Sequence, residues 1–212
     1  IASAVTEGLN SQDYQLPQLT QLLQHSDQSS SAAIELEIRT THAVLKLATD
    51  LSRGRFSATA ADPDWHIPRT DFDAVAFLQE AIQADHLEDS LQKLSPQTLN
   101  YQLLKRTLAH YQELLRNTPE WIRIPSSPSI RPGDTHSSIP LIRQRIMQAH
   151  AADGLSEFNL TPGTSQLYDT ELVAAIKAFQ AQHGLNTDGI IGKNTINALN
   201  IPLEWKIRQL RI

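Results

Sequence analysis

A proline-rich segment at residues 124–133 constrains the fold of this chain more than any other feature, because no helix can run through it. The segment reads IPSSPSIRPG, and its three prolines each remove a backbone donor that a helix needs. Apolar residues recur at helical spacing on both sides of it. We therefore expect an all-α chain with two domains, residues 1–125 and residues 126–202, joined by this linker.

The first domain is predicted to consist of stacked helical hairpins. One helix should end near Gly54, and a second should start at Thr70, with Asp73 completing a variant of the capping box. A third should start at Ser95, which precedes a proline, and end before Pro119. The apolar face of the first helix is expected to comprise Ile34, Ile38, Thr41, Leu45 and Ala48.

The second domain is predicted to be a small unit of three helices, near the lower practical size for a core without disulfides or metals. The helices should cover about 139–153, about 169–183 and a short segment after Gly192. Phe179 shares a helix face with Leu172 and Ile176, so we expect it in the core. Asp188 and Gly189 are typical of a turn, because Asp bonds nearby backbone and Gly tolerates positive φ.

Composition excludes several classes of protein. The chain has a net charge of −5, and residues 126–212 hold 8 Lys/Arg against 7 Asp/Glu, so a nucleic-acid partner is not expected. No apolar run approaches the roughly 18–20 residues of a membrane span. Cysteine is absent, which excludes disulfides, thiolate metal sites and a cysteine nucleophile. Since the first residue is Ile1, we expect a trimmed or processed chain.

The sequence indicates no catalytic residue, metal site or cofactor. The 8 histidines are scattered and none has the spacing of metal ligands. The acidic segment at 85–89 is interpreted as a solvated helix surface, because its neighbours point in different directions. No pair of carboxylates is singled out for glycoside cleavage, and no Gly-x-Ser-x-Gly elbow is present.

Residues 131–202 resemble the helical peptidoglycan-binding domain of cell-wall enzymes. The resemblance rests on an ordered set of short motifs, which are YD at 168–169, AIKAFQ at 175–180, HGL at 183–185, DGIIG at 188–192 and ALN at 198–200. It implies that the partner is peptidoglycan, which consists of glycan strands and stem peptides.

The earlier part of the chain is similar to the helical scaffold of the large periplasmic murein L,D-transpeptidases. The matching segments are GL at 8–9, TDLSRGR at 49–55, Trp65 and LSP at 94–96. The family joins scaffold, peptidoglycan-binding domain and catalytic domain, so the resemblance implies that residues 203–212 begin a catalytic domain missing from this chain. That domain acts through a cysteine thiolate, which this chain lacks, so no position here inherits a catalytic role.

Three residues of the second domain are candidates for ligand binding: Arg143, Gln180 and Asp188. Gln180 could donate to a glycan hydroxyl or a stem-peptide carbonyl, or it could bond the backbone of the following turn. Arg143, like Arg145, could pair with stem-peptide carboxylates or lie on a solvated helix face. Asp188 could take part in recognition or only shape its turn.

The resemblance therefore implies the non-catalytic region of a periplasmic enzyme that forms 3→3 cross-links in the cell wall. The chain itself should be inactive. Two alternatives stay open, namely a stand-alone wall-binding protein without enzymatic activity and the targeting region of a peptidoglycan hydrolase or amidase.

Overall fold

The structure, a computed structural model, describes the whole chain except residues 26–28, 57–61, 63, 65–70, 118–119, 154–159 and 212. The described residues are helical, as predicted, and contain no strand beyond two isolated antiparallel bridges, Ile130–Ile191 and Thr135–Leu167. The chain divides into two compact units. We call Ile1–Leu108 with Leu210–Ile212 the N-unit, and Ala109–Gln209 the C-unit.

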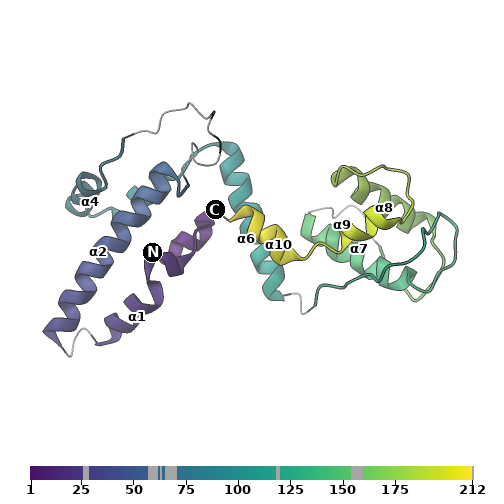
Figure 1. Ribbon diagram of the computed structural model, residues 1–212, viewed down its shortest axis with the longest axis horizontal. Coiled ribbons are helices and arrows are strands. Elements are labelled where there is room, and N and C mark those ends of the chain that lie inside the picture. Colours follow the sequence, from purple (N-terminus) through teal and green to yellow (C-terminus); the bar gives the residue numbers. More distant parts are fainter. Residues whose placement is uncertain are drawn as a thin grey trace. The chain divides into compact units, whose positions relative to one another are not determined.

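The N-unit is arranged around one long helix, α2 (Ser30–Arg53). Two short 3₁₀ helices, η1 (Ala2–Glu7) and η2 (Ser11–Tyr14), lead into α1 (Leu16–His25), and α4 (Ala74–Gln83), α5 (Leu87–Leu94) and the first part of α6 (Leu99–Asn117) follow α2. The helices α1, α4 and α5 each contact α2, and Figure 1 shows α1 and α4 beside it. The unit is therefore a layer of helices that share α2 as their common partner.

The core of the N-unit differs from the predicted apolar face of α2. Ile34 and Ile38 are 58% and 65% exposed, whereas Ala43, Val44, Leu47 and Ala48 are buried. The buried cluster joins the second half of α2 to Tyr14 and Leu19, so only that half has neighbours on its apolar side. The predicted face was wrong for its first half, because helical spacing alone does not say where along a helix the partner elements lie.

The structure can be compared with one helix end and one helix start predicted for the N-unit. The helix α2 ends at Gly54, whose φ of +71° needs a residue without a side chain, so this prediction is confirmed. The third helix does not start at Ser95, because Ser95 follows α5 directly as its C-terminal cap. Instead α6 begins at Leu99, and the hydroxyl of Thr98 accepts the Tyr101 N–H at 3.4 Å. Residues 85–89 were interpreted as a helix surface, and Glu88 and Asp89 do lie on α5, but the bounds of this short helix were not predicted.

The start predicted for the second helix is corrected in part. Asp73 alone caps α4, because its Oδ1 accepts the N–H groups of Val75 and Ala76 at 2.9 and 3.0 Å. Thr70, the expected cap residue, lies outside the described residues.

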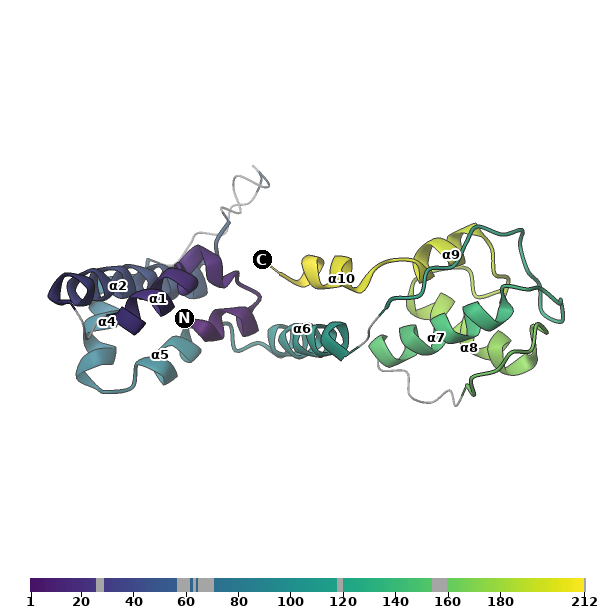
Figure 2. The same cartoon turned by 90° about the horizontal axis from the view of Figure 1, so that it is seen from below.

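The C-unit contains the three predicted helices, α7 (Ile139–Asp153), α8 (Thr170–Gln182) and α9 (Lys193–Leu199), followed by α10 (Leu203–Leu210). The helix α7 packs against α8 and α9, and Figure 2 shows α7 alongside α8. Phe179 is buried at their centre, as predicted. The core consists mainly of aliphatic side chains: Ile124, Ile130, Ile139, Ile142, Ile146, Ala149, Leu160, Tyr168, Leu172, Ala175, Ile176, Phe179, Ile191, Ile196 and Leu199.

Residues on both flanks of these three helices pack into the C-unit. Ile124 is part of the core, and the side chain of Asn200 exchanges two hydrogen bonds of 2.8 Å with its backbone. Trp121 donates its Nε1–H to the Ile201 carbonyl at 2.9 Å, and Leu203 of α10 is fully buried. The division between the units thus falls within α6, earlier than the proline-rich segment where we expect the domain boundary.

Candidate functional site

The three predicted ligand-binding residues lie in the C-unit but do not line one cavity. Gln180 on α8 and Asp188 in the following turn contact each other, because the Gln180 Nε2 donates to the Asp188 Oδ1 at 3.2 Å. Arg143 on α7 pairs with the carboxylate of Asp169 instead. The structure therefore distributes the three side chains over two networks.

Gln180 is bonded within the protein at both ends of its amide. Its side chain is 1% exposed, and Nε2 also donates to the Ile190 carbonyl at 3.0 Å and the Thr195 hydroxyl at 3.1 Å. Its Oε1 accepts the N–H of Gly189 at 2.9 Å. Of the two interpretations of Gln180, the bonds to the turn are the ones observed.

The turn after α8 has the chemistry predicted for it. The Asp188 Oδ1 accepts the N–H of Ile190 at 2.8 Å, and Gly189 has a φ of +74°. A Cβ placed on Gly189 would lie 3.0 Å from the Lys177 Cε and 3.3 Å from the Val173 Cγ1. A glycine is thus required here both by the backbone conformation and by the side chains of α8 that cross it.

Arg143 holds the N-terminal end of α8 in place. Its side chain is only 4% exposed and forms an ion pair with the Asp169 Oδ2, while the Asp169 Oδ1 accepts the N–H of Leu172 at 2.9 Å. Arg145 is buried too, with its guanidinium 3.8 Å from the centre of the Trp121 ring. Burial lowers the pKa of Arg145 to about 10. A solvated helix face was therefore the wrong interpretation for both arginines, whose side chains are buried.

A groove with a cavity volume of about 620 Å³ lies beside the first half of α8. Leu167 is 46% exposed at its rim, and Tyr168 is buried below and donates its hydroxyl to the Gly189 carbonyl at 2.7 Å. Burial raises the pKa of Tyr168. The groove is lined by Pro132, Gly133, Leu167, Tyr168, Asp169, Thr170, Val173, Ala174 and Lys177.

The predicted residues support this groove from behind rather than lining it. Arg143 fixes Asp169, and Gln180 fixes the turn at Gly189 on which the Tyr168 hydroxyl depends. The lining residues themselves were missed by the sequence analysis. A signal for one wall was present, because Val173 and Lys177 are four positions apart and must share a helix face.

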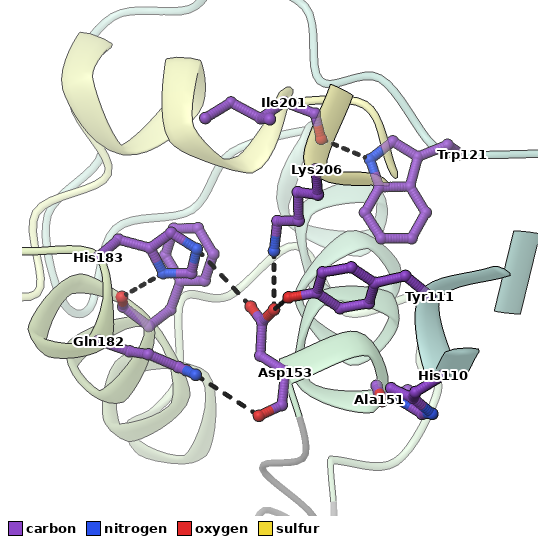
Figure 3. Close-up of polar contacts among 10 residues, drawn as sticks. His110, Tyr111, Trp121, Ala151, Asp153, Gln182, His183, Ile201 and Lys206 are labelled. Atoms are coloured by element: carbon purple, nitrogen blue, oxygen red, sulfur yellow. Dashed lines mark hydrogen bonds and ion pairs between the residues drawn. The ribbon is translucent and has the colours of Figure 1, made fainter. Parts of the chain in front are cut away.

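A second polar cluster is centred on Asp153 at the end of α7 (Figure 3). Its Oδ1 accepts hydrogen bonds from the Lys206 Nζ at 2.7 Å and the Tyr111 hydroxyl at 3.2 Å, and its Oδ2 lies 3.6 Å from the His183 Nε2. The His183 ring stacks on Phe179, with ring centres 3.9 Å apart. Burial and the charge of Asp153 raise the pKa of Tyr111 to about 12. This carboxylate therefore joins α7 to α6, α8 and α10.

The described residues offer no group of three or more side chains that could hold a metal ion. Within the same part of the chain, every helix is too short or too polar to cross a bilayer.

Two known families match this chain, one in its N-terminal part and one in its C-terminal part, in the same order as the motifs of the sequence. Residues 1–108 match the family described as "Scaffold domain". Residues 152–199, which contain α8, α9 and most of the groove, match the family described as "Putative peptidoglycan binding domain". No curated protein matches the chain.

These matches assign a domain to each unit. The second match, over the α8 and α9 region, supports peptidoglycan as a partner and association with the cell wall. The first covers more than half of the chain, from η1 to the middle of α6. The chain therefore belongs to the Scaffold domain family and also carries a peptidoglycan-binding domain of the kind found in cell-wall proteins.

Proposed function

We propose that this chain is the scaffold and peptidoglycan-binding region of a periplasmic murein L,D-transpeptidase. The observation that carries the proposal is the order of the two matched domains, a scaffold at 1–108 followed by a peptidoglycan-binding domain at 152–199. Residues 1–125 and 126–202 are the corresponding domains of the proposal. The same order is what the resemblance of the short motifs implies.

In this proposal the reaction takes place outside residues 1–212. Formation of a 3→3 cross-link needs a nucleophile that takes up the donor stem peptide as an acyl-enzyme, and a thiolate deprotonated by a nearby histidine does this well. The chain contains no cysteine, so its part is to bind the wall. Residues 203–212 would lead toward the catalytic domain.

The groove beside α8 supports a weak contact with a single wall fragment. It is shallow, and Lys177 is the charged side chain in its lining that has no partner among the described residues. Ordering a flexible wall fragment offsets much of the contact energy. We expect a Kd of roughly 0.1–1 mM for one short muropeptide, or about 4–5.5 kcal/mol.

Binding to the wall is tested by sedimentation with insoluble sacculi. The purified chain should be retained better than its affinity for a single muropeptide suggests, because neighbouring sites recapture a molecule that dissociates. A protein of similar size and charge without a peptidoglycan-binding domain is the control. Equal retention of the two proteins would contradict the wall-binding role.

The transpeptidase part of the proposal is tested separately. The gene should continue into a domain with a cysteine and a histidine, and the full-length protein should form cross-linked dimers from tetrapeptide muropeptides. The present chain should form none, since it lacks a thiol. A downstream domain with metal ligands, or a stop codon directly after residue 212, would contradict this assignment and leave wall binding unaffected.

A further inference from the structure

The groove beside α8 is apolar along its sides. Leu167, Val173, Ala174 and the ring of Pro132 supply aliphatic surface, and the exposed Leu167 is the largest apolar side chain at the rim. Surfaces of this kind favour methyl and methylene groups, because contact with them removes apolar area from water. The sides of the groove therefore suit a ligand with small aliphatic groups.

Lys177 supplies a positive charge to the same groove. Its ammonium group has no ion pair or hydrogen bond among the residues that the structure describes. Its stem crosses Gly189, where a Cβ would lie 3.0 Å from the Lys177 Cε. The glycine thus lets the lysine stem lie against the turn.

The other charged residue of the groove does not cancel Lys177. One oxygen of Asp169 pairs with the buried guanidinium of Arg143, and the other caps α8 at the N–H of Leu172. The Asp169 carboxylate is therefore already paired with a cation of the protein, and the same Arg143 also lies 3.9 Å from the Oε2 of the exposed Glu171. Among the described residues that line the groove, Lys177 is thus the charged side chain that is not paired within the protein.

Peptidoglycan contains two chemically different partners for such a groove. Its glycan strand is neutral and covered with hydroxyl and acetamido groups, which need several polar partners or an exposed aromatic face for binding. Its stem peptide carries alanine methyl groups and free carboxylates. The groove has no exposed aromatic ring among its described lining residues, because Tyr168 is buried.

We infer that this groove binds the stem peptide, with alanine methyl groups against the Leu167–Val173 side and a free carboxylate paired with Lys177. The inference rests on the proposed wall binding and narrows it from peptidoglycan as a whole to one of its components. Lys177 then selects an anionic end, while the apolar sides contribute contact area. Neither Arg143 nor Gln180 touches the ligand, and both act by positioning groove residues.

The test is a titration of the full chain with each ligand, in which binding is measured by changes in the NMR amide shifts. The probes are the free tetrapeptide L-Ala-γ-D-Glu-diaminopimelate-D-Ala, the same peptide with its carboxylates amidated, and a glycan fragment without peptide. Shifts with the free peptide should cluster at residues 167–177 and residue 189. The amidated peptide and the glycan fragment should bind at least about fivefold more weakly.

Lys177→Gln is the variant that tests the charge, and Lys193→Gln is its matched control. Lys193 is an exposed lysine on the first turn of α9 that does not line the groove. We expect Lys177→Gln to weaken binding of the free peptide about three- to tenfold and to remove the preference over the amidated peptide, as loss of one charge-assisted pair should. Lys193→Gln should bind as the parent chain does. Added salt should weaken binding to the parent chain more than to Lys177→Gln.

Two results would overturn the inference. Equal affinity of Lys177→Gln and Lys193→Gln for the free peptide would remove Lys177 from the site. Binding of the glycan fragment with shifts at the groove, and none with the peptide, would assign the groove to the other component while wall binding stands. Loss of sacculus retention in the parent chain would instead contradict the proposed function itself.

Discussion

The two units of this chain fill their interiors differently. In the C-unit the core side chains are almost completely buried, and polar groups within it, such as the amide of Gln180 and the hydroxyl of Tyr168, are bonded to the turn at Gly189. In the N-unit the buried cluster is smaller and lies along one half of α2. Large apolar side chains such as Ile38 and Leu99, which is 72% exposed, lie at its surface.

This difference teaches where a precise site can be built. A side chain in a close-packed interior has one position, and it can hold its neighbours to within a fraction of an ångström. The groove beside α8 depends on such side chains, because Arg143 and Gln180 fix two of its walls from inside. The exposed apolar residues of α2 and α6 offer no comparable support.

Removing the Phe179 ring should give the largest contrast between the units. We expect Phe179→Ala to lower the free energy of unfolding of the C-unit by about 3–5 kcal/mol, since the ring is buried at the centre of the core. Ile38→Ala in the N-unit should cost below about 0.5 kcal/mol because Ile38 is largely exposed.

Thermal unfolding with probes in each unit measures both effects. The transition of the N-unit should stay almost unchanged in Phe179→Ala if the units unfold separately. A single transition that shifts as a whole would show that they unfold as one cooperative body.

The Asp153 carboxylate provides the next largest effect. Asp153→Ala leaves the largely buried Lys206 ammonium and the Tyr111 hydroxyl without their acceptor, and loss of one partner of such a pair costs roughly 3 kcal/mol. Hydrogen exchange should become faster in α10 and in the part of α6 near Tyr111. Asp134→Ala, at an exposed aspartate outside this cluster, is the control, and equal exchange in the two variants would contradict the role of Asp153.

Gln180→Ala should have a smaller effect on stability. The variant also tests whether Gln180 only holds the turn at Gly189 or contacts a ligand directly. The variant leaves the Gly189 N–H without its acceptor, which costs about 2 kcal/mol. The Thr195 hydroxyl loses the donor Gln180 Nε2 but keeps its own bond to the Ile190 carbonyl at 3.2 Å. Amide shifts at 188–191 should change in the absence of any ligand, and sacculus retention should fall only as far as the turn moves. Unchanged shifts in the free protein together with lost retention would make Gln180 a direct ligand residue.

The success of prediction from sequence follows the same contrast. In the C-unit the helices α7, α8 and α9, the buried Phe179 and the Asp188–Gly189 turn were predicted correctly, because periodicity, caps and turn residues agree there. The helix α10 was not predicted. In the N-unit Ser95 was taken for a helix start. A hydroxyl residue before proline is favoured at such a start, and the short helix α5, which ends at Leu94 with Ser95 as its C-terminal cap, gave too weak a signal.

The residues that line the groove could not be predicted from the sequence. The candidate residues were open to two interpretations each, since Gln180 could bind a ligand or the following turn, and Arg143 could pair with a ligand carboxylate or lie on a solvated helix face. The structure turns Arg143 and Gln180 inward, because a turn and a helix end within the core need hydrogen-bond partners. Packing between elements far apart in sequence decides whether a polar side chain bonds within the protein or to a ligand. Helical periodicity carries no information on that packing.

The smallest predicted effect is a pH dependence confined to the C-unit. His150 on α7 is buried, and burial lowers its pKa, as does the charge of His183, while the backbone at Ala175 and the charge of Asp153 act in the opposite direction. Above the ordinary histidine pKa of about 6.5 the ring is neutral in both the folded and the unfolded chain, so it does not affect stability. Below that pH the unfolded chain takes up the proton more readily than the folded one. The C-unit should therefore lose stability as pH falls from about 6.5 toward the lowered pKa of His150.

The measurement is the melting temperature of the C-unit between pH 7.5 and pH 5, compared in the parent chain and His150→Gln. The variant should show the shallower decrease, and equal decreases in the two proteins would assign the pH dependence to other groups.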